Sequence, residues 1–437
     1  MDFKLPLNIL HLSTSDFGGA GKAAHRLHQS MIAAGHNSKL LVASKRNFSD
    51  DIVDVGISYK YALRALSKLS ARLVSQTPDY YFNLNFHLGI LSASHILKYI
   101  PFKPDVIFAH SISSFLTPKH LYALNKLTGS PIVWYVVDAA PFTGGCHFSW
   151  DCDGYISQCG RCPALYSSSA KDLSYWQLKF KRKYVQKSDI AVIACTSLQA
   201  MQISKSVIFS SKPIEKIMLS TDPEIFRPIS KEMSRAILNL PRDKKIIFFG
   251  AESLNYKRKG MGYLLDALNI LRGRLNEQPE LKERILVIFA GKSGNDDLIN
   301  KIPFPNRNLG FLNDDRILAM AYQASDLFVS PSVDDAGPLM INEAIMCGTP
   351  VVSFNIGVAP DLVIKNKTGY AAEAKDSEDL ANGMYQFLQM DSKRIHLMSE
   401  DCRNISLRLY HPQAQLQKIM TFVNTLINQN RKHSTNI

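Results

Sequence analysis

The segment from Ser330 to Gly357, SPSVDDAGPLMINEAIMCGTPVVSFNIG, constrains the fold more than any other part of the chain. An apolar run ending at Ser330 has the composition of a buried strand, and a loop with two adjacent carboxylates follows it. A helical run then leads to Gly348, which suits a helix C-cap, and 351–354 has the composition of the next buried parallel strand. Open parallel sheets bind nucleotides and sugars at the carboxyl ends of their strands. The segment therefore predicts a βαβ unit of an α/β protein, with acidic groups at a ligand-binding edge.

The same alternation of apolar strands and helical runs recurs along the chain and predicts two domains. A chain of 437 residues is long enough for two domains of ordinary size, each with its own core. The alternation restarts at 245–249, after a Pro-containing linker at 218–228. We predict an N-terminal Rossmann-like domain (1–210, with a Cys-rich insert at 143–165), a second Rossmann-like domain (211–405), and a C-terminal helix and tail (406–437).

Asp335 and Glu343 are eight residues apart, and the string after them reads A-x-x-C-G-T-P-V-V. This pattern resembles the E-x7-E signature of retaining glycosyltransferases of family 4, with Asp in place of the first Glu. The likeness continues to Gly357, Pro360 and Thr368-Gly369. For an isolated pair of acids, the simpler interpretation is a solvated helix face and a polar loop, but the intact string favours the family.

The resemblance implies the GT-B fold, in which two Rossmann-like domains face each other across a cleft that holds the active site. The C-terminal helix of such enzymes crosses back to the first domain. The implied activity is the transfer of a sugar from a UDP- or GDP-sugar, with retention, to a saccharide or lipid-linked saccharide in cell-surface polysaccharide synthesis. The resemblance implies no cofactor and no metal for catalysis.

By the same resemblance, the catalytic candidates are Asp335, Glu343 and Lys259. Lys259 stands in a Lys-Gly pair whose lysine meets the donor diphosphate in the family, and Arg258 would supply a second cation because Glu252 stands near the usual arginine position. A leaving diphosphate develops negative charge, which cations and amide donors must stabilise. Glu343 would accept hydrogen bonds from the ribose hydroxyls, and Asp335 would bind sugar hydroxyls. The donor-binding set is Gly18, Gly19, Arg258, Lys259, Gly337, Pro338, Leu339, Met340 and Glu343.

The glycines in this set come from two places, and Gly18 and Gly19 belong to a turn after the first strand. Glycines there let backbone amides approach a phosphate at a helix N-terminus. Asp16 and Ala23 occupy positions that a P-loop would give to Gly and Ser/Thr. A tight turn without any ligand is the open alternative, and the likeness to the glycine-rich first loop of family 4 favours the functional interpretation.

On the acceptor side, the candidates are His110 and Asp138, because each follows a predicted strand. Single polar residues in such places are more often structural than catalytic. Many relatives carry a histidine directly before this aspartate, whereas this chain has Val137. The role of that histidine would fall to Asp138 or His110, or remain unfilled.

Four of the seven cysteines lie close together in the sequence and predict a structural zinc site: Cys146, Cys152, Cys159 and Cys162. Disulfides are rare in a reducing cytoplasm, and four thiolates with a closing C-x2-C spacing suit tetrahedral zinc. His147 is a substitute ligand, while buried free thiols or a redox-sensitive loop are the alternatives. The string P-F-T-G-G-C-H resembles a subgroup of family 4 from bacterial exopolysaccharide and lipopolysaccharide clusters.

The net charge of +13 is concentrated in the N-terminal half, where residues 1–200 carry 21 Lys+Arg and 12 Asp+Glu. Such a surface suits an anionic membrane, an anionic acceptor or nucleic acid, but no nucleic-acid motif is present.

A predicted helix at 57–77 has leucines on one face and a basic row on the other, so it would lie on an anionic membrane or pack on the core with a solvated face. No signal peptide and no spanning run is present. The sequence predicts a cytoplasmic protein, with a peripheral position on the inner membrane face as an alternative.

Two other functions remain open as alternatives. A nucleotide-sugar epimerase can share the fold, although such enzymes usually carry further acid and histidine pairs that this sequence lacks. A non-catalytic binding protein containing zinc would account for the basic half and the cysteine cluster. The combination of the D-x7-E string with the Lys-Gly pair argues against both.

Overall fold

The computed structural model describes residues 6–56, 77–84, 92–292, 298–337 and 339–435, together with positions 59, 61, 62, 65 and 68. The helix predicted at 57–77 therefore lies almost wholly outside the described residues. The chain forms two compact units, the first made of Met1–Ser220 and Gln413–Ile437 and the second of Thr221–Pro412. These boundaries differ from the predicted 210 and 405. β7 (Ile214–Lys216) still pairs with the first sheet, and α14 (Ser392–Tyr410) still packs on the second unit.

The first unit is built on a seven-stranded parallel sheet with the strand order β3-β2-β1-β4-β5-β6-β7. Its central strands are buried along their whole length, and alternate side chains enter separate apolar clusters on the two faces of the sheet. The described strands and helices of this unit are β1 (Asn8–Ser15), α1 (Gly18–Ala33), β2 (Asn37–Ser44), β3 (Ile52–Asp54), α3 (Ala93–Leu97), β4 (Val106–Ala109), α4 (Pro118–Thr128), β5 (Ile132–Val136), α5 (Leu173–Gln186), β6 (Ile190–Ala194), α6 (Ser197–Lys205) and β7. Short 3-10 turns lie at Pro78–Tyr80, Gly154–Ile156 and Pro163–Leu165.

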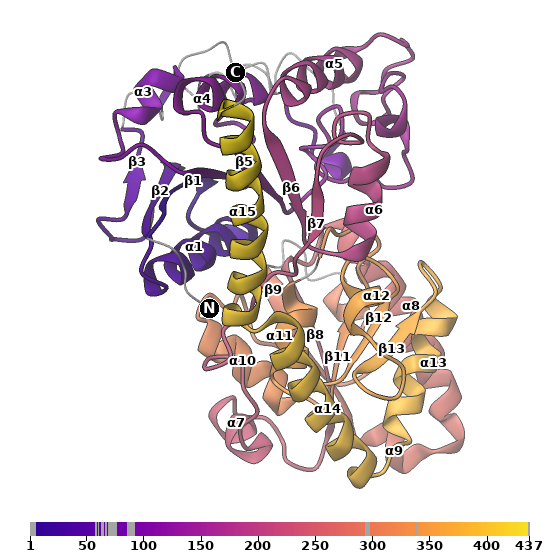
Figure 1. Ribbon diagram of the computed structural model, residues 1–437. Helices are drawn as coiled ribbons and strands as arrows, with labels where there is room; N and C mark the ends of the chain where they lie inside the picture. Colours follow the sequence, from indigo (N-terminus) through magenta and orange to yellow (C-terminus); the bar gives the residue numbers. More distant parts are fainter. Residues whose placement is uncertain are drawn as a thin grey trace. The chain divides into compact units, whose positions relative to one another are not determined.

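The C-terminal helix α15 (Pro412–Thr435) covers one face of this first sheet (Figure 1). Ile419, Val423, Leu426 and Ile427 follow the spacing of one helical face and join the apolar cluster beneath the sheet. Phe108 of β4 belongs to the same cluster. This apolar stripe ties the end of the chain to the first unit, as the GT-B fold requires.

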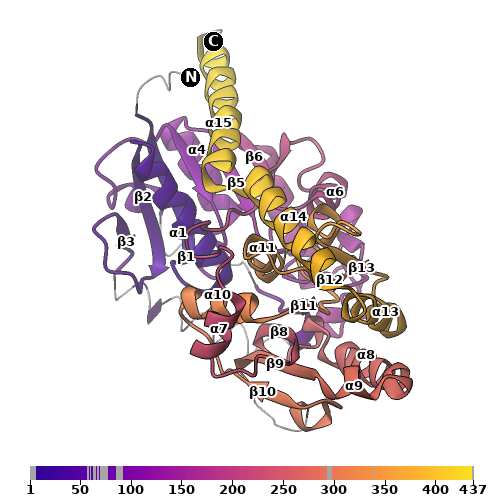
Figure 2. The same cartoon turned by 90° about the horizontal axis from the view of Figure 1, so that it is seen from below.

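The second unit repeats the design with a six-stranded parallel sheet in the order β10-β9-β8-β11-β12-β13. Helices α8 and α13 of this unit pack against each other, side by side, as Figures 1 and 2 both show. Its elements are α7 (Lys231–Ile237), β8 (Lys245–Ser253), a 3-10 turn η4 (Lys257–Lys259), α8 (Met261–Arg274), α9 (Pro279–Glu283), β9 (Ile285–Lys292), β10 (Asn306–Asn308), α10 (Asp315–Ala324), β11 (Leu327–Ser330), α11 (Leu339–Met346), β12 (Val351–Phe354), α12 (Ala359–Leu362), β13 (Gly369–Ala372), α13 (Ser377–Leu388) and α14. Two further 3-10 turns lie at Leu275–Glu277 and Ile299–Lys301. The predicted βαβ unit around the Ser330–Gly357 segment is confirmed as β11, α11 and β12.

Within the part of the chain that the structure describes, no helix combines the length and the apolar composition needed to cross a membrane.

Three histidines lie buried together in the first unit. His11 Nδ1 is 3.0 Å from His110 Nε2, and His28 Nδ1 is 2.7 Å from Ser38 Oγ. Burial lowers the pKa of His28 to about 4 and that of His110 to about 3. Burial, together with the two neighbouring histidines, also lowers the pKa of His11 well below its ordinary value. All three rings are therefore neutral in the folded protein at pH 7.

These histidines predict that the first unit loses stability in mild acid. The unfolded chain takes up protons below about pH 6.5 whereas the folded rings do not, so stability is complete above that pH. Between pH 6.5 and about 4, each buried histidine is expected to cost about 1.4 kcal/mol of unfolding free energy per pH unit. Urea unfolding at pH 7 and pH 5 measures the loss.

Tryptophan fluorescence follows the first unit in that experiment, because all three tryptophans lie there: Trp134, Trp150 and Trp176. His28→Gln should reduce the pH dependence, whereas the exposed His396→Gln should leave it unchanged. An unfolding free energy that is the same at pH 7 and pH 5 would contradict the prediction.

Candidate functional site

The predicted donor residues of the second unit lie near the topological switch point of its sheet. β8 pairs with β9 on one side and with β11 on the other, so the connections after β8 and β11 leave in opposite directions. Such a point leaves a crevice at the carboxyl ends of the strands, where ligands bind in open α/β sheets. The Lys257–Gly260 turn follows β8, and the Asp334-Asp335 loop follows β11.

A glycine holds these two loops against each other. Gly260 has φ +73°, and a Cβ on it would lie 1.7 Å from the carbonyl oxygen of Pro331. Only glycine combines the left-handed conformation with so close an approach of two backbones. The amide of Val333 also donates to the carbonyl of Arg258 at 2.8 Å. The Lys-Gly pair of the sequence is therefore needed for the geometry of the loop as well as for its charge.

Asp335 forms a partly buried ionic cluster with the two cations of this turn. Its Oδ2 accepts hydrogen bonds from Lys259 Nζ and, at 3.1 Å, from Arg258 Nη1, while Oδ1 accepts from the amide of Gly337 at 3.2 Å. Burial alone would raise the pKa of Asp335, but Lys259 and then Arg258 outweigh it and hold the pKa below its ordinary value. Asp335 thus orients the two cations. The sequence predicts that Asp335 binds sugar hydroxyls. In the structure its carboxylate already accepts hydrogen bonds from Lys259, Arg258 and Gly337.

Glu343 lies on α11 and is 5% exposed, so it is not the solvated helix-face residue of the simpler interpretation. Its Oε2 accepts a hydrogen bond from the hydroxyl of Tyr322 at 3.2 Å. Burial, and then the Glu343 carboxylate, raise the pKa of that phenol well above its ordinary value, so Tyr322 remains a donor. Helix α14 supports α11 from behind, because Tyr410 donates to the carbonyl of Asn342 at 2.7 Å.

The other predicted donor residues of this loop surround the start of α11. Leu339 is the first residue of that helix, Gly337 precedes it in contact with Asp335, and Pro338 lies outside the described residues. The side chain of Met340 lies over Gly250, where a Cβ would approach the Met340 methyl group to 2.5 Å. The amides of the first helical turn are the ordinary anion-binding groups of such a site.

The glycine-rich turn of the first unit is shaped by Gly18, whose φ of +71° favours glycine, and by two residues that the sequence did not single out for ligand binding. Gly18 and Gly19 begin α1, and a Cβ on either would meet no atom within 4 Å. Gly21 is the glycine that close packing requires, since its Cβ would lie 2.7 Å from the carbonyl oxygen of Ser15. Asp16 accepts hydrogen bonds from the amides of Arg46 and Asn47, and so fastens the turn to the end of β2. In the structure these contacts shape the turn, and the predicted role of Gly18 and Gly19 in donor binding stays a prediction.

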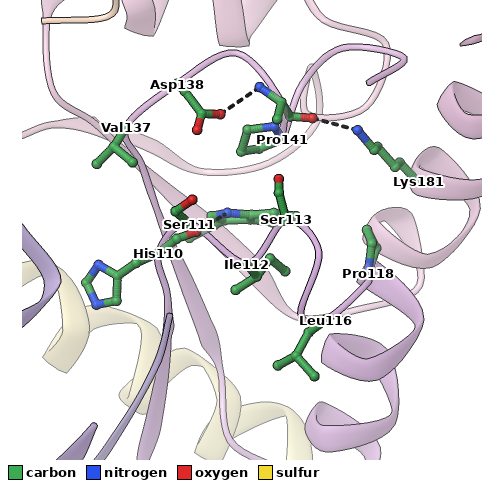
Figure 3. Close-up of a pocket in the computed structure, with 12 residues that line it drawn as sticks. His110, Ser111, Ile112, Ser113, Leu116, Pro118, Val137, Asp138, Pro141 and Lys181 are labelled. Atoms are coloured by element: carbon green, nitrogen blue, oxygen red, sulfur yellow. Dashed lines mark hydrogen bonds between the residues drawn. The ribbon is translucent and has the colours of Figure 1, made fainter. Parts of the chain in front are cut away.

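His110 and Asp138 both line one pocket of about 350 Å³, measured with its open mouth, after strands β4 and β5 (Figure 3). The ring of His110 points away from the hydroxyls of Ser111 and Ser113 and bonds to His11 instead. Asp138 accepts hydrogen bonds from the amide of Ala140 at 2.8 Å and from His147 Nδ1 at 2.9 Å. Burial would raise the pKa of Asp138, but the partnership with His147 outweighs it and keeps the pKa below its ordinary value. Asp138 is the acceptor-side candidate whose carboxylate faces a ligand space.

The four clustered cysteines lie near one another but not in a metal-binding arrangement, and the zinc site stays a prediction. In the described part of the chain, which includes all four, no group of three or more His, Cys, Asp or Glu side chains is arranged to hold a metal ion. Each of three thiols has local partners instead: Thr143 for Cys146, the backbone at Gly144 for Cys159, and Ser174 with two backbone amides for Cys162. Burial raises the pKa of Cys146 and of Cys159 to about 12, which keeps them protonated. The arrangement agrees with the alternative interpretation of free thiols.

Sequence reasoning placed Ser111 beside His110 at the expected cleft, but it missed His147 as the partner of Asp138, and it missed Lys181 and Ser113. Lys181 stands in a basic and aromatic stretch of the sequence, now α5, that carries no recognised site motif. A signal was nevertheless present, because Lys181 lies on the same helical face as the buried residues Leu178 and Val185. A lysine on an apolar stripe indicates a buried amine.

Comparisons with known proteins agree with this geometry. Residues 230–403 match the model of the family "Glycosyl transferases group 1". D-inositol 3-phosphate glycosyltransferases are 26% identical over 211 residues in Saccharomonospora viridis and 25% identical over 205 residues in Mycolicibacterium smegmatis. These matches cover 44% and 46% of this chain, and 46% and 45% of those proteins. The chain thus spans about half the length of the curated relatives it matches.

Solved glycosyltransferases share the fold across nearly the whole chain. WaaG, a glycosyltransferase involved in lipopolysaccharide biosynthesis, superposes with a TM-score of 0.63 at 15% identity, covering 94% of this chain and 99% of WaaG. HepE of Anabaena, solved in complex with UDP and glucose, gives a TM-score of 0.61 at 16% identity over 96% of this chain and 100% of HepE. The two parallel-sheet domains therefore have the GT-B fold, and residues 230–403 resemble the glycosyl transferases group 1 family.

Proposed function

We propose that this protein is a retaining glycosyltransferase of family 4 that transfers a sugar from a nucleotide-diphosphate sugar to a saccharide or lipid-linked saccharide of the cell surface. The observation that carries the proposal is the cluster of Lys259, Arg258 and Asp335 at the switch point of the second sheet. Two oriented cations beside a helix N-terminus suit a leaving diphosphate, whose negative charge grows as the glycosidic bond breaks.

In this proposal each group has a stated task. Lys259 and Arg258 neutralise the diphosphate, and Asp335 holds both cations in place before the donor arrives. Glu343 accepts hydrogen bonds from the ribose hydroxyls while Tyr322 orients its carboxylate. The solved complexes of HepE with UDP and with UDP-glucose support a nucleotide sugar as the donor class.

A thermal-shift panel of UDP, GDP and ADP on the wild type and on Glu343→Ala tests the proposal. We expect one nucleotide to stabilise the wild type, and the variant to bind that nucleotide about 10- to 100-fold more weakly. This is the effect of removing a charged hydrogen-bond acceptor that is worth about 1.5–3 kcal/mol. Glu400→Ala is the matched control, because Glu400 is an exposed carboxylate on α14. If Glu343→Ala folds and binds the nucleotide as tightly as the wild type, Glu343 is not part of the donor site. If no nucleotide stabilises the wild type, the proposed donor class is refuted.

A further inference from the structure

The pocket beside Asp138 contains a group that the proposed donor chemistry does not use. Lys181, on α5, is 2% exposed, and it lines the pocket. Its ammonium donates to the carbonyl oxygens of Ala140 at 2.6 Å and Thr143 at 3.0 Å. An ammonium has three N–H donors, so one donor remains after these two bonds.

The positive charge of Lys181 is only partly balanced, by an electrostatic interaction with the Asp138 carboxylate that is not an ion pair. Among the described residues, no carboxylate forms an ion pair with its ammonium, and neutral carbonyls are its hydrogen-bond partners. Burial lowers the pKa of Lys181 to about 8, while Cys146, Cys159 and Asp138 partly oppose that effect. A buried charge without a paired charge is strongly destabilising, and a purely apolar side chain would avoid that cost. Such a group at the wall of a pocket suits an anionic ligand that supplies the missing charge.

The rest of the pocket suits a polyhydroxylated ring. The hydroxyls of Ser111 and Ser113 have no hydrogen-bond partner among the described residues, and Figure 3 shows both pointing toward the Asp138–Pro141 loop. Asp138 uses one acceptor position on each carboxylate oxygen and retains further lone pairs for ligand hydroxyls. The apolar wall is formed by Ile112, Leu116, Pro118, Trp134 and Pro141.

Asp138 and Lys181 lie on either side of Pro141 in Figure 3. A ligand that meets both would therefore carry its hydroxyls and its negative charge on different parts of one small ring.

We propose that this pocket binds the acceptor through one acidic sugar unit, a ring that carries a carboxylate or a phosphate group. Lys181 pairs with the anionic group, Ser111 and Ser113 donate to the ring, and Asp138 accepts from its hydroxyls. His147 acts as a positioning residue, because it holds the Asp138 carboxylate from the Cys-rich insert while Asn83 bonds its other ring nitrogen at 2.7 Å. This inference rests on the proposed glycosyltransferase function, since it names the class of acceptor.

Calorimetric titration with glucuronate, glucose 6-phosphate and glucose tests the inference on the full-length protein. We expect at least one acidic sugar to bind at millimolar concentration and glucose to bind at least tenfold more weakly. Binding of glucuronate alone assigns a carboxylate, and binding of glucose 6-phosphate alone assigns a phosphate. Lys181→Met should abolish the preference for the acidic sugar. Lys179→Met, which removes an exposed charge from the same helix, should keep it. Equal binding of acidic and neutral sugars, or binding of neither acidic sugar, would overturn the inference.

Lys181→Met also removes the hydrogen bonds to two loop carbonyls, so the variant can lose its fold for structural reasons. The pH dependence of acidic-sugar binding, compared between the wild type and Lys181→Arg, provides a measurement that does not depend on the Lys181→Met variant. In the wild type, affinity for the acidic sugar should fall as the pH rises through about 8, the value at which Lys181 loses its proton. Arginine keeps its charge at that pH, so Lys181→Arg should retain binding there. A purely structural lysine would give the same profile in both proteins.

The nucleotide panel separates this inference from the proposed function. If the protein binds a nucleotide through Glu343 but binds neither acidic sugar, the proposed function stands and the proposed acceptor class is refuted. If the protein binds an acidic sugar through Lys181 but binds no nucleotide, the sugar-binding pocket is supported and the proposed glycosyltransferase function is refuted.

Discussion

Replacement of Lys259 by methionine is expected to lower the turnover of the donor about 10²- to 10³-fold. The ammonium is one of two cations at the proposed diphosphate position, and removal of one charge-stabilising group from a transition state costs about 2.7–4 kcal/mol. Turnover is measured as nucleotide released from the donor that the thermal-shift panel identifies. Lys257→Ala is the matched control, because Lys257 belongs to the same turn but is exposed. A Lys257→Ala enzyme that loses as much activity as Lys259→Met would show that the effect comes from general charge.

Lys259 also neutralises the partly buried Asp335, so the single variant changes both stability and chemistry. The double variant Lys259→Met with Asp335→Asn removes one charge of each sign and leaves no unpaired carboxylate. We expect this double variant to recover most of the melting temperature that Lys259→Met loses, while its turnover remains low. If turnover returned together with stability, the role of Lys259 would be to neutralise Asp335 and not to contact the donor.

Asp326→Ala is expected to lower the unfolding free energy of the second unit by about 3–5 kcal/mol, the usual cost of removing one partner from a buried ion pair. Asp326 precedes β11 and accepts hydrogen bonds from Lys231 at 2.7 Å, from Arg235 at 2.9 Å and from the amide of Ile246 at 2.7 Å. These contacts join α7, β8 and β11. Burial would raise the pKa of Asp326, but Lys231 and Arg235 hold it below its ordinary value, so the carboxylate is ionised. Removal of Asp326 leaves Arg235 buried without its counterion.

Urea unfolding followed by circular dichroism measures this loss, and tryptophan fluorescence reports the first unit alone in the same samples. Glu224→Ala is the control, because Glu224 is 81% exposed in its pair with Arg227 and such pairs contribute about 0–1 kcal/mol. A loss below 1 kcal/mol in Asp326→Ala would show that solvent already screens the cluster.

The local design of the second unit could be predicted from the sequence because its signals are short-range. The apolar runs at 327–330 and 351–354 have the length and composition of buried parallel strands, and Gly348 marks the end of the helix between them. Gly348 has φ +78°, the left-handed conformation that a helix C-cap takes. The interpretation of the D-x7-E string as more than a solvated face agrees with the burial of Glu343, because a surface carboxylate would not need the buried hydroxyl of Tyr322 as a partner.

The contacts of the predicted site residues depend on elements that are distant in the chain. Asp335 and Lys259 are 76 positions apart, and they meet because β8 and β11 are neighbours in the sheet while β9 and β10 lie beyond β8. The sequence suggested that both residues belong to a donor site, but it assigned Asp335 to sugar hydroxyls. Only the packed loops show that its carboxylate already holds two cations.

The sequence alone therefore determined the strand and helix pattern, the two domains and the residue types of the donor loop, because periodicity and turn chemistry act over a few residues. The tertiary structure decided which side chains are buried and what they contact. It gave three of the four clustered thiols local hydrogen-bond partners, turned His110 into the core, and placed Lys181 and His147 around Asp138. Burial and charge pairing arise between segments far apart in the sequence, so the spacing of residues does not reveal them.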